Sequence, residues 1–171
     1  AYTASGGIKN YFQVLEKKFN IDIEYMFRGA RTWPYRKGIV QEGIRAVKDL
    51  IKFQKKISQK DYSVVQTSTS LSPYSLLRDG LFLFIARANG VKTISFFRGW
   101  KPETEKMIEK RYLFLFQYFF LKCDSLIVLS NQFKDRLISW GYKGDIHVET
   151  TIVHEALIKD ISTKTIKHKY D

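Results

Sequence analysis

The sequence predicts a doubly wound, Rossmann-like α/β domain built around a parallel sheet. Short apolar segments alternate along the chain with segments of helical period, and turns rich in glycine, proline or asparagine separate them. Several of the apolar segments contain almost no polar residues, which is typical of parallel strands covered by helices on both faces. At 171 residues the chain has the size of one such domain.

The first predicted elements are a helix and a strand. Apolar residues recur every three or four positions after Gly6 and Gly7, which predicts a helix over 8–20. IDIEYMF (21–27) alternates apolar and polar residues and predicts a strand, and the glycine and proline of 28–38 predict a loop after it.

Two helices around a second strand are predicted next. The segment 38–57 has an apolar face that contains Ile44, Val47, Leu50 and Ile51. DYSVVQTSTS (61–70) predicts a short strand that passes into a hydroxyl-rich loop. In the helix predicted over 72–90, Ser72 is interpreted as the N-cap, Pro73 lies in the first turn, and an Asn-Gly pair ends the helix.

The remaining elements complete a predicted sheet of five strands. KTISFF (92–97), DSLIVLS (124–130) and DIHVETT (145–151) predict strands, and helices are predicted over 103–122 and 131–140. Because right-handed crossovers join parallel strands, these helices are expected to cover the sheet.

Both ends of the predicted domain raise a question. A Gly-Gly loop that opens a helix normally follows a strand in this architecture, yet only AYTAS precedes it, which leaves open that the central first strand is missing from this chain. The segment 159–171 has little apolar content and predicts a linker or frayed end. The predicted domain therefore covers 1–158.

The charge balance is strongly basic. Lysine and arginine outnumber aspartate and glutamate by 29 to 17, for a net charge of +12, which would attract nucleic acid, anionic lipid or phosphorylated small molecules. The single cysteine, Cys123, cannot form an internal disulfide and is interpreted as core filler, and the three histidines do not cluster at metal-ligand spacing. These features predict a cytoplasmic protein without a metal site.

The most apolar segments, 81–86 and 112–121, are shorter than the ~20 residues that span a bilayer, so no transmembrane helix is predicted. The sequence YLFLFQYFFL (112–121) is interpreted as a helix buried on most sides rather than as a lipid anchor.

Candidate site residues follow several of the predicted strands, where ligands of doubly wound sheets bind. Gly6 and Gly7 open a helix whose free backbone N–H groups favour an anion, although a simple turn remains the alternative. Hydroxyl groups that donate and accept hydrogen bonds suit sugar recognition, and they are supplied by Thr67, Ser68 and Thr69.

Two arginines are further candidates. Arg98, followed by Gly99, comes at the end of a predicted strand, where a guanidinium could donate paired hydrogen bonds to phosphate or carboxylate. The alternative is a structural pair with Glu103 or Glu105. Arg78 could reach an acidic acceptor, or could form an ion pair with a carboxylate such as the neighbouring aspartate.

Four segments in order, SGGIKNYFQVLEKKF, DYSVVQTSTSLSPYSLLRD, FFRGW and CDSLIVLSNQFKDRLISWGY, resemble the N-terminal half of a retaining GT-B glycosyltransferase. The resemblance is to the large group that contains many bacterial lipopolysaccharide and capsule enzymes, and it covers roughly 5–157. It implies two Rossmann-like domains across a cleft, with the acceptor held mainly by the first and the nucleotide sugar by the second. The donor-side domain is not in this chain, so the chain alone is expected to be inactive.

The resemblance also implies residue roles. Gly6 and Gly7 would lie near the donor diphosphate, and Arg98 stands where many relatives have a histidine that reaches toward the donor sugar. Ser130 matches a serine near the acceptor, although a helix N-cap is an equal alternative. The donor phosphate itself is thought to help deprotonate the acceptor in this family, so no cofactor and few protein bases are required.

Expected partners are a nucleotide sugar and a glycan or lipid-linked acceptor. The basic segment 28–56, with Trp33 and Tyr35, suits an anionic membrane surface, against the alternative of a solvated helix face. A nucleic-acid or acidic-polymer binding module is the competing function, disfavoured because the aromatic residues are predicted within strands and apolar helix faces rather than on one exposed stripe. Half of a GT-B-like sugar-nucleotide epimerase, or a lone partner domain, also remains open.

Overall fold

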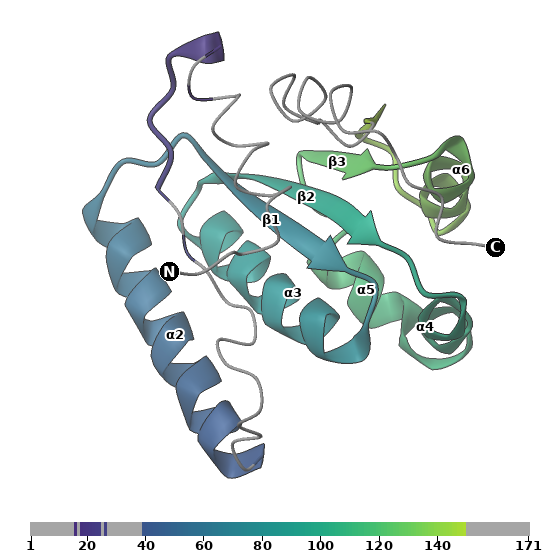
Figure 1. Cartoon of the computed structure of the whole chain (residues 1–171), viewed down its shortest axis with the longest axis horizontal. Helices are drawn as coiled ribbons and strands as arrows, with labels where there is room; N and C mark the ends of the chain where they lie inside the picture. The colour runs from purple at the N-terminus through teal and green to yellow at the C-terminus, as the bar shows by residue number, and fades with distance from the viewer. Residues whose placement is uncertain (1–15, 17, 25, 27–38, 150–171) are drawn as a thin grey trace, which may run out of the picture. The chain divides into compact units, whose positions relative to one another are not determined.

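The computed structural model describes residues 16, 18–24, 26 and 39–149 (Figure 1). The chain divides into two compact units, one formed by 37–150 and the other by 1–36 together with 151–171. The architecture below belongs to the first unit.

A four-stranded parallel sheet forms the centre of this unit. Its strands are β1 (Val64–Ser70), β2 (Lys92–Gly99), β3 (Ser125–Val128) and β4 (Asp145–Val148), in the order β1-β2-β3-β4. The α/β class with a parallel, Rossmann-like sheet is therefore confirmed. A doubly wound sheet is defined by a point at which the strand order reverses. Among the described residues the strand order does not reverse.

Helices make each crossover between neighbouring strands. They are α3 (Pro73–Ala88) between β1 and β2, the continuous α4 (Pro102–Met107), η1 (Ile108–Tyr112) and α5 (Leu113–Phe119) between β2 and β3, and α6 (Asn131–Ser139) between β3 and β4. Figure 1 shows α3 and α5 on the same side of the sheet.

All three crossovers contribute to one hydrophobic core. Leu83 of α3, Phe116 of α5 and Leu137 of α6 belong to the same buried cluster as Phe97 and Val128, which are paired in the register of β2 and β3. Since side chains alternate across a strand, this cluster lies on one face of the sheet, whereas Phe96 and Ile127 are buried on the other face.

The helix α2 (Ile39–Gln59) packs against α3 from the side, where the rings of Phe53 and Phe82 meet edge to face with centroids 4.9 Å apart. Ile57 is buried on the same side of α2. The apolar face predicted from Ile44, Val47 and Ile51 is not the core face, because these side chains are 52%, 56% and 64% exposed.

The five-residue π-helical segment η1 sets which side of α5 faces the core. An α-helix turns about 100° per residue, so buried Thr104 and Phe120 would point about 160° apart in an uninterrupted helix. A π turn holds one extra residue and reduces this difference to about 60°. Ile108 and Phe116 consequently face the core together with these two residues.

Two further predictions need correction. The strand predicted over 21–27 is wrong where the structure describes it, because Ile21–Glu24 and Met26 form no strand, whereas the predicted helix end near Asn20 is confirmed by its positive φ of 49°. The strand 61–70 does not pass into a loop: β1 continues to Ser70.

The interpretation of 112–121 as a helix buried on most sides is also wrong. Phe116 and Phe120 are buried, but a helix in an outer layer has only one side against the sheet, and four other apolar side chains are exposed: Tyr112 (42%), Phe114 (65%), Leu115 (38%) and Tyr118 (44%). Phe114 and Tyr118 of α5 are thus exceptions to the expectation that aromatic residues lie mostly within strands and apolar helix faces.

Candidate functional site

The carboxyl ends of β1 and β2 bring two of the predicted loops together. Ser70 pairs with Gly99, and the Leu71 N–H donates to the Gly99 carbonyl at 2.6 Å. A Cβ added to Gly99 would lie 3.1 Å from Ser70 Oγ, a distance that few real contacts reach. Glycine at this position thus allows the Ser70 hydroxyl to lie directly against the end of β2.

Arg98 occupies an irregularity in this pair of strands. Thr69 is opposite Phe97 and Ser70 is opposite Gly99, so Arg98 is the extra residue of a β-bulge. Bulges bend a strand and redirect a side chain, and they are frequent beside functional sites. This placement explains why an arginine can end a core strand.

The Arg98 guanidinium lies over the sheet. Its Cζ is 5.3 Å from the ring centroid of Phe96, and Nη1 is shielded from solvent. Ser68 pairs with Phe96 in the register, so Ser68, Phe96 and Arg98 share the face of the sheet opposite α3, α5 and α6. Arg98 and Ser68 are therefore brought together by the fold.

Thr67 and Thr69 lie on the other face, against the helices. Both are buried, and with Ser95 they form a hydroxyl cluster in which Thr67 Oγ1 donates to Ser95 Oγ at 3.3 Å and Thr69 Oγ1 donates to Thr67 Oγ1 at 3.1 Å. Of the three predicted acceptor-contacting hydroxyl residues, only Ser68 lies on the face of Arg98.

Arg78 forms an ion pair with its neighbour, the alternative that the sequence left open. Its Nε and Nη2 donate to Asp79 Oδ1 and Oδ2 at 2.6 and 3.1 Å. Burial raises the pKa of Asp79, against the opposing hydrogen bonds from Arg78 and Thr69. Burial lowers the pKa of Arg78, but the hydrogen bond and charge of Asp79 outweigh it and the pKa is raised overall.

Ser130 is the N-cap of α6. Its Oγ accepts a hydrogen bond from the Phe133 N–H at 3.3 Å, so the capping alternative is confirmed. Ser72 has the backbone position of an N-cap, but its hydroxyl donates to Ser75 Oγ at 3.0 Å and makes no capping hydrogen bond.

A network that was not predicted from the sequence joins the segment after β2 to α6. Trp100 stacks on Phe133 with ring centroids 4.5 Å apart, and its Nε1 donates to Glu105 at 2.6 Å. Arg136 Nε and Nη1 lie 2.6 and 2.9 Å from Glu105 and Glu109. Glu105, considered above as a partner for Arg98, is thus engaged by Trp100 and Arg136.

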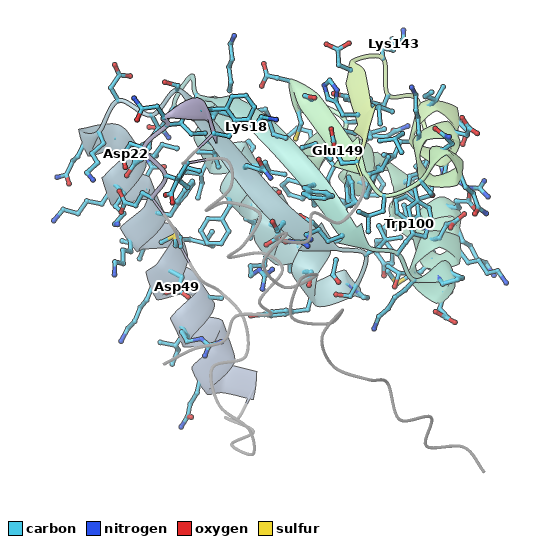
Figure 2. All side chains as sticks on the ribbon, turned by 45° about the horizontal axis from the view of Figure 1, so that its top comes forward. Lys18, Asp22, Asp49, Trp100, Lys143 and Glu149 are labelled. Carbon is cyan, nitrogen blue, oxygen red and sulfur yellow. The ribbon has the colours of Figure 1, made fainter. Side chains whose placement is uncertain are left out.

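This network holds the loop beyond Gly99 against the start of α6, next to Ser130. Trp100 follows β2, whereas Lys143 precedes β4, and Figure 2 shows them at opposite ends of the sheet. The signal in the sequence was the spacing of Glu105 and Glu109, which puts both carboxylates on one side of a helix.

Other predicted features fall outside the described residues or leave the site unchanged. Gly6, Gly7 and the aromatic pair Trp33 and Tyr35 lie outside them. Within the described part of the chain, no three His, Cys, Asp or Glu side chains are grouped as a metal site, and no helix is long and apolar enough to cross a membrane. Cys123 is buried as predicted, and burial raises its pKa to about 11.

The arrangement can therefore offer a guanidinium and small hydroxyl groups at the carboxyl ends of adjacent parallel strands. Comparison of the chain with protein-family models, curated proteins and solved structures found no match. The resemblance to a GT-B glycosyltransferase accordingly stays a prediction, which the parallel α/β sheet supports only at the level of fold class.

Proposed function

We propose that the chain is the acceptor-side domain of a sugar-nucleotide-dependent glycosyltransferase that builds a cell-surface polysaccharide or glycolipid. The observation that carries this proposal is the junction of β1 and β2, where Ser70 lies against Gly99 and the preceding residue, Arg98, forms a bulge. In parallel α/β sheets, ligands bind beyond the carboxyl ends of the strands, which is where this junction lies.

Arg98 would anchor a negatively charged group of the donor or acceptor. A guanidinium remains protonated near neutral pH and so cannot act as a general base, but it donates two parallel hydrogen bonds to phosphate or carboxylate. Ser68, on the same face, and Ser70, at the junction, carry hydroxyl groups suited to a sugar. Sugar transfer with retention, as the resemblance implies, would use the donor phosphate to accept the acceptor proton.

Ligand titrations followed by NMR would test this site. Nucleotide sugars and glycan acceptors, added one at a time to the chain, should shift the amide signals of Ser70, Arg98 and Gly99. Because a hydrogen bond to a charged group contributes about 1.5–3 kcal/mol, Arg98→Ala should weaken binding about 10- to 150-fold.

Lys92→Ala is the matched control, since Lys92 begins the same strand and its removal changes the net charge equally. Equal weakening by both substitutions would show that overall charge, and not the position of Arg98, explains the weaker binding. Shifts confined to the amino ends of the strands would contradict the proposed site.

The transfer reaction itself needs a donor-side domain. We expect no release of nucleotide diphosphate from a nucleotide sugar by the 171-residue chain alone, and release when a donor-side domain is joined to it. Release by the chain alone would contradict this division of labour.

A further inference from the structure

Exposed apolar side chains lie on the outer side of both α3 and α5. These helices are in contact, and Figure 1 shows them side by side. A Cβ on Gly80 would lie 2.9 Å from the Phe119 ring, so a glycine permits this close approach. The surface, called the α3/α5 face below, consists of Leu77 (59% exposed), Phe84 (40%), Phe114 (65%), Leu115 (38%) and Tyr118 (44%).

The two helices share this surface rather than each presenting a separate patch. Phe84 of α3 and Tyr118 of α5 have ring centroids 5.9 Å apart. Phe114 precedes Tyr118 by four residues and Leu77 precedes Phe84 by seven, spacings that place each pair on one side of its helix. The π-helical η1 contributes by turning Phe114 and Tyr118 outward while Phe116 turns inward.

Basic residues border the α3/α5 face. Lys110, Arg111 and Lys122 are exposed, and Lys122 Nζ lies 4.9 Å from the ring centroid of Tyr118. Two acidic residues of the same continuous helix point toward α6, because Glu105 and Glu109 pair with Arg136.

Asp124, close in sequence to Lys122, is likewise turned away. Its Oδ2 accepts hydrogen bonds from the N–H and hydroxyl of Thr93 at 2.7 and 3.2 Å. The border of the face is thus basic, around an apolar centre.

We propose that the α3/α5 face docks on a bilayer that contains anionic lipid. Exposed Phe, Leu and Tyr side chains suit the boundary between headgroups and acyl chains, and lysine and arginine at the border attract anionic headgroups. A protein partner is less favoured because lysine is depleted in protein–protein interfaces. This inference does not depend on sugar transfer, so either proposal can fail without the other.

Cosedimentation with vesicles provides the test. The chain should bind vesicles of phosphatidylcholine and phosphatidylglycerol, and bind vesicles of phosphatidylcholine alone much less. Arg111→Glu with Lys122→Glu should weaken binding by at least about 25-fold, from about fivefold for each basic residue lost. Phe114→Ser with Leu115→Ser should weaken it about tenfold or more through lost apolar burial.

Matched variants on other surfaces separate this face from general charge or hydrophobicity. Ile138→Ser removes a side chain of α6 that is 50% exposed, and Lys143→Glu reverses an exposed charge before β4. Both should bind vesicles nearly as the unchanged chain does. Circular dichroism and the urea midpoint verify that each variant is folded.

Three results would overturn the proposal. The first is vesicle binding that survives the α5 substitutions but is lost on Lys48→Glu with Lys52→Glu, which would place docking on α2. The second is a dimer, seen by light scattering, that Phe114→Ser with Leu115→Ser dissociates, without vesicle binding. The third is a salt-sensitive shift with single-stranded DNA that requires Arg111 and Lys122, again without vesicle binding.

Discussion

On the inner side of α5, Phe116 and Phe120 are 3% and 1% exposed, and their ring centroids lie 5.8 and 5.5 Å from that of Phe97. On the outer side, Phe114 and Tyr118 are 65% and 44% exposed and stand beside lysine and arginine. Aromatic residues of the same segment thus meet a close-packed core in one direction and solvent in the other. The comparison shows that the aromatic content of a helix does not by itself determine which of its faces is buried.

The largest difference in stability should appear when a ring on the inner side and a ring on the outer side are removed in separate variants. Phe120→Ala is expected to lower the free energy of unfolding by about 3–5 kcal/mol, because it leaves a cavity against Phe97 and Phe116. Phe114→Ala should change it by no more than about 0.5 kcal/mol. Urea unfolding of both variants measures the difference, and similar losses would show that the outer side is also packed.

The reactivity of Cys123 tests whether the inner side of α5 is closed to solvent, because Cys123 belongs to the same buried cluster as Phe116 and Phe120. Burial raises the pKa of its thiol from 9.0 to about 11. At a pH well below both pKa values, a rise of that size lowers the thiolate fraction about 100-fold. Alkylation of the folded chain by iodoacetamide at pH 7.5 should therefore be at least about 100-fold slower than alkylation of the chain unfolded in urea. Fast labelling of the folded chain would mean that the inner side opens readily.

The smallest effect should come from two helix glycines. Gly80→Ala places a Cβ 2.9 Å from the Phe119 ring, so it should destabilise the fold by about 1–3 kcal/mol. Gly43→Ala meets no atom within 4 Å on exposed α2 and should stabilise it by about 0.5–1 kcal/mol through helix propensity. Thermal unfolding curves give both signs, and stabilisation by Gly80→Ala would show that α3 and α5 can separate at little cost.

Much of the local structure could be predicted from the sequence. Pro73 and the Asn-Gly pair correctly predicted both ends of α3, and Gly141, with a φ of +100°, follows α6 as expected. These predictions succeeded because capping and left-handed turns depend on a few neighbouring residues. The alternation of apolar and polar residues at 21–24 failed because a strand also needs a partner to pair with.

The candidate site was predictable only in part. Residues after successive parallel strands had to lie at one end of the sheet, which brought Ser70 and Gly99 together. The bulge at Arg98 was not predictable, because it depends on the register between β1 and β2. Nor was the inward burial of Thr67 and Thr69, because a shift of one residue in the register of a strand moves its hydroxyl groups to the other face.

The order of local elements, the parallel α/β class and the basic net charge were determined by the sequence itself, since periodicity, turn residues and composition act over short distances along the chain. The tertiary structure alone decided that all three crossovers share one core face, that Arg98 is bulged, and that one side of α5 remains open. These features depend on which segments, distant in sequence, pack against each other.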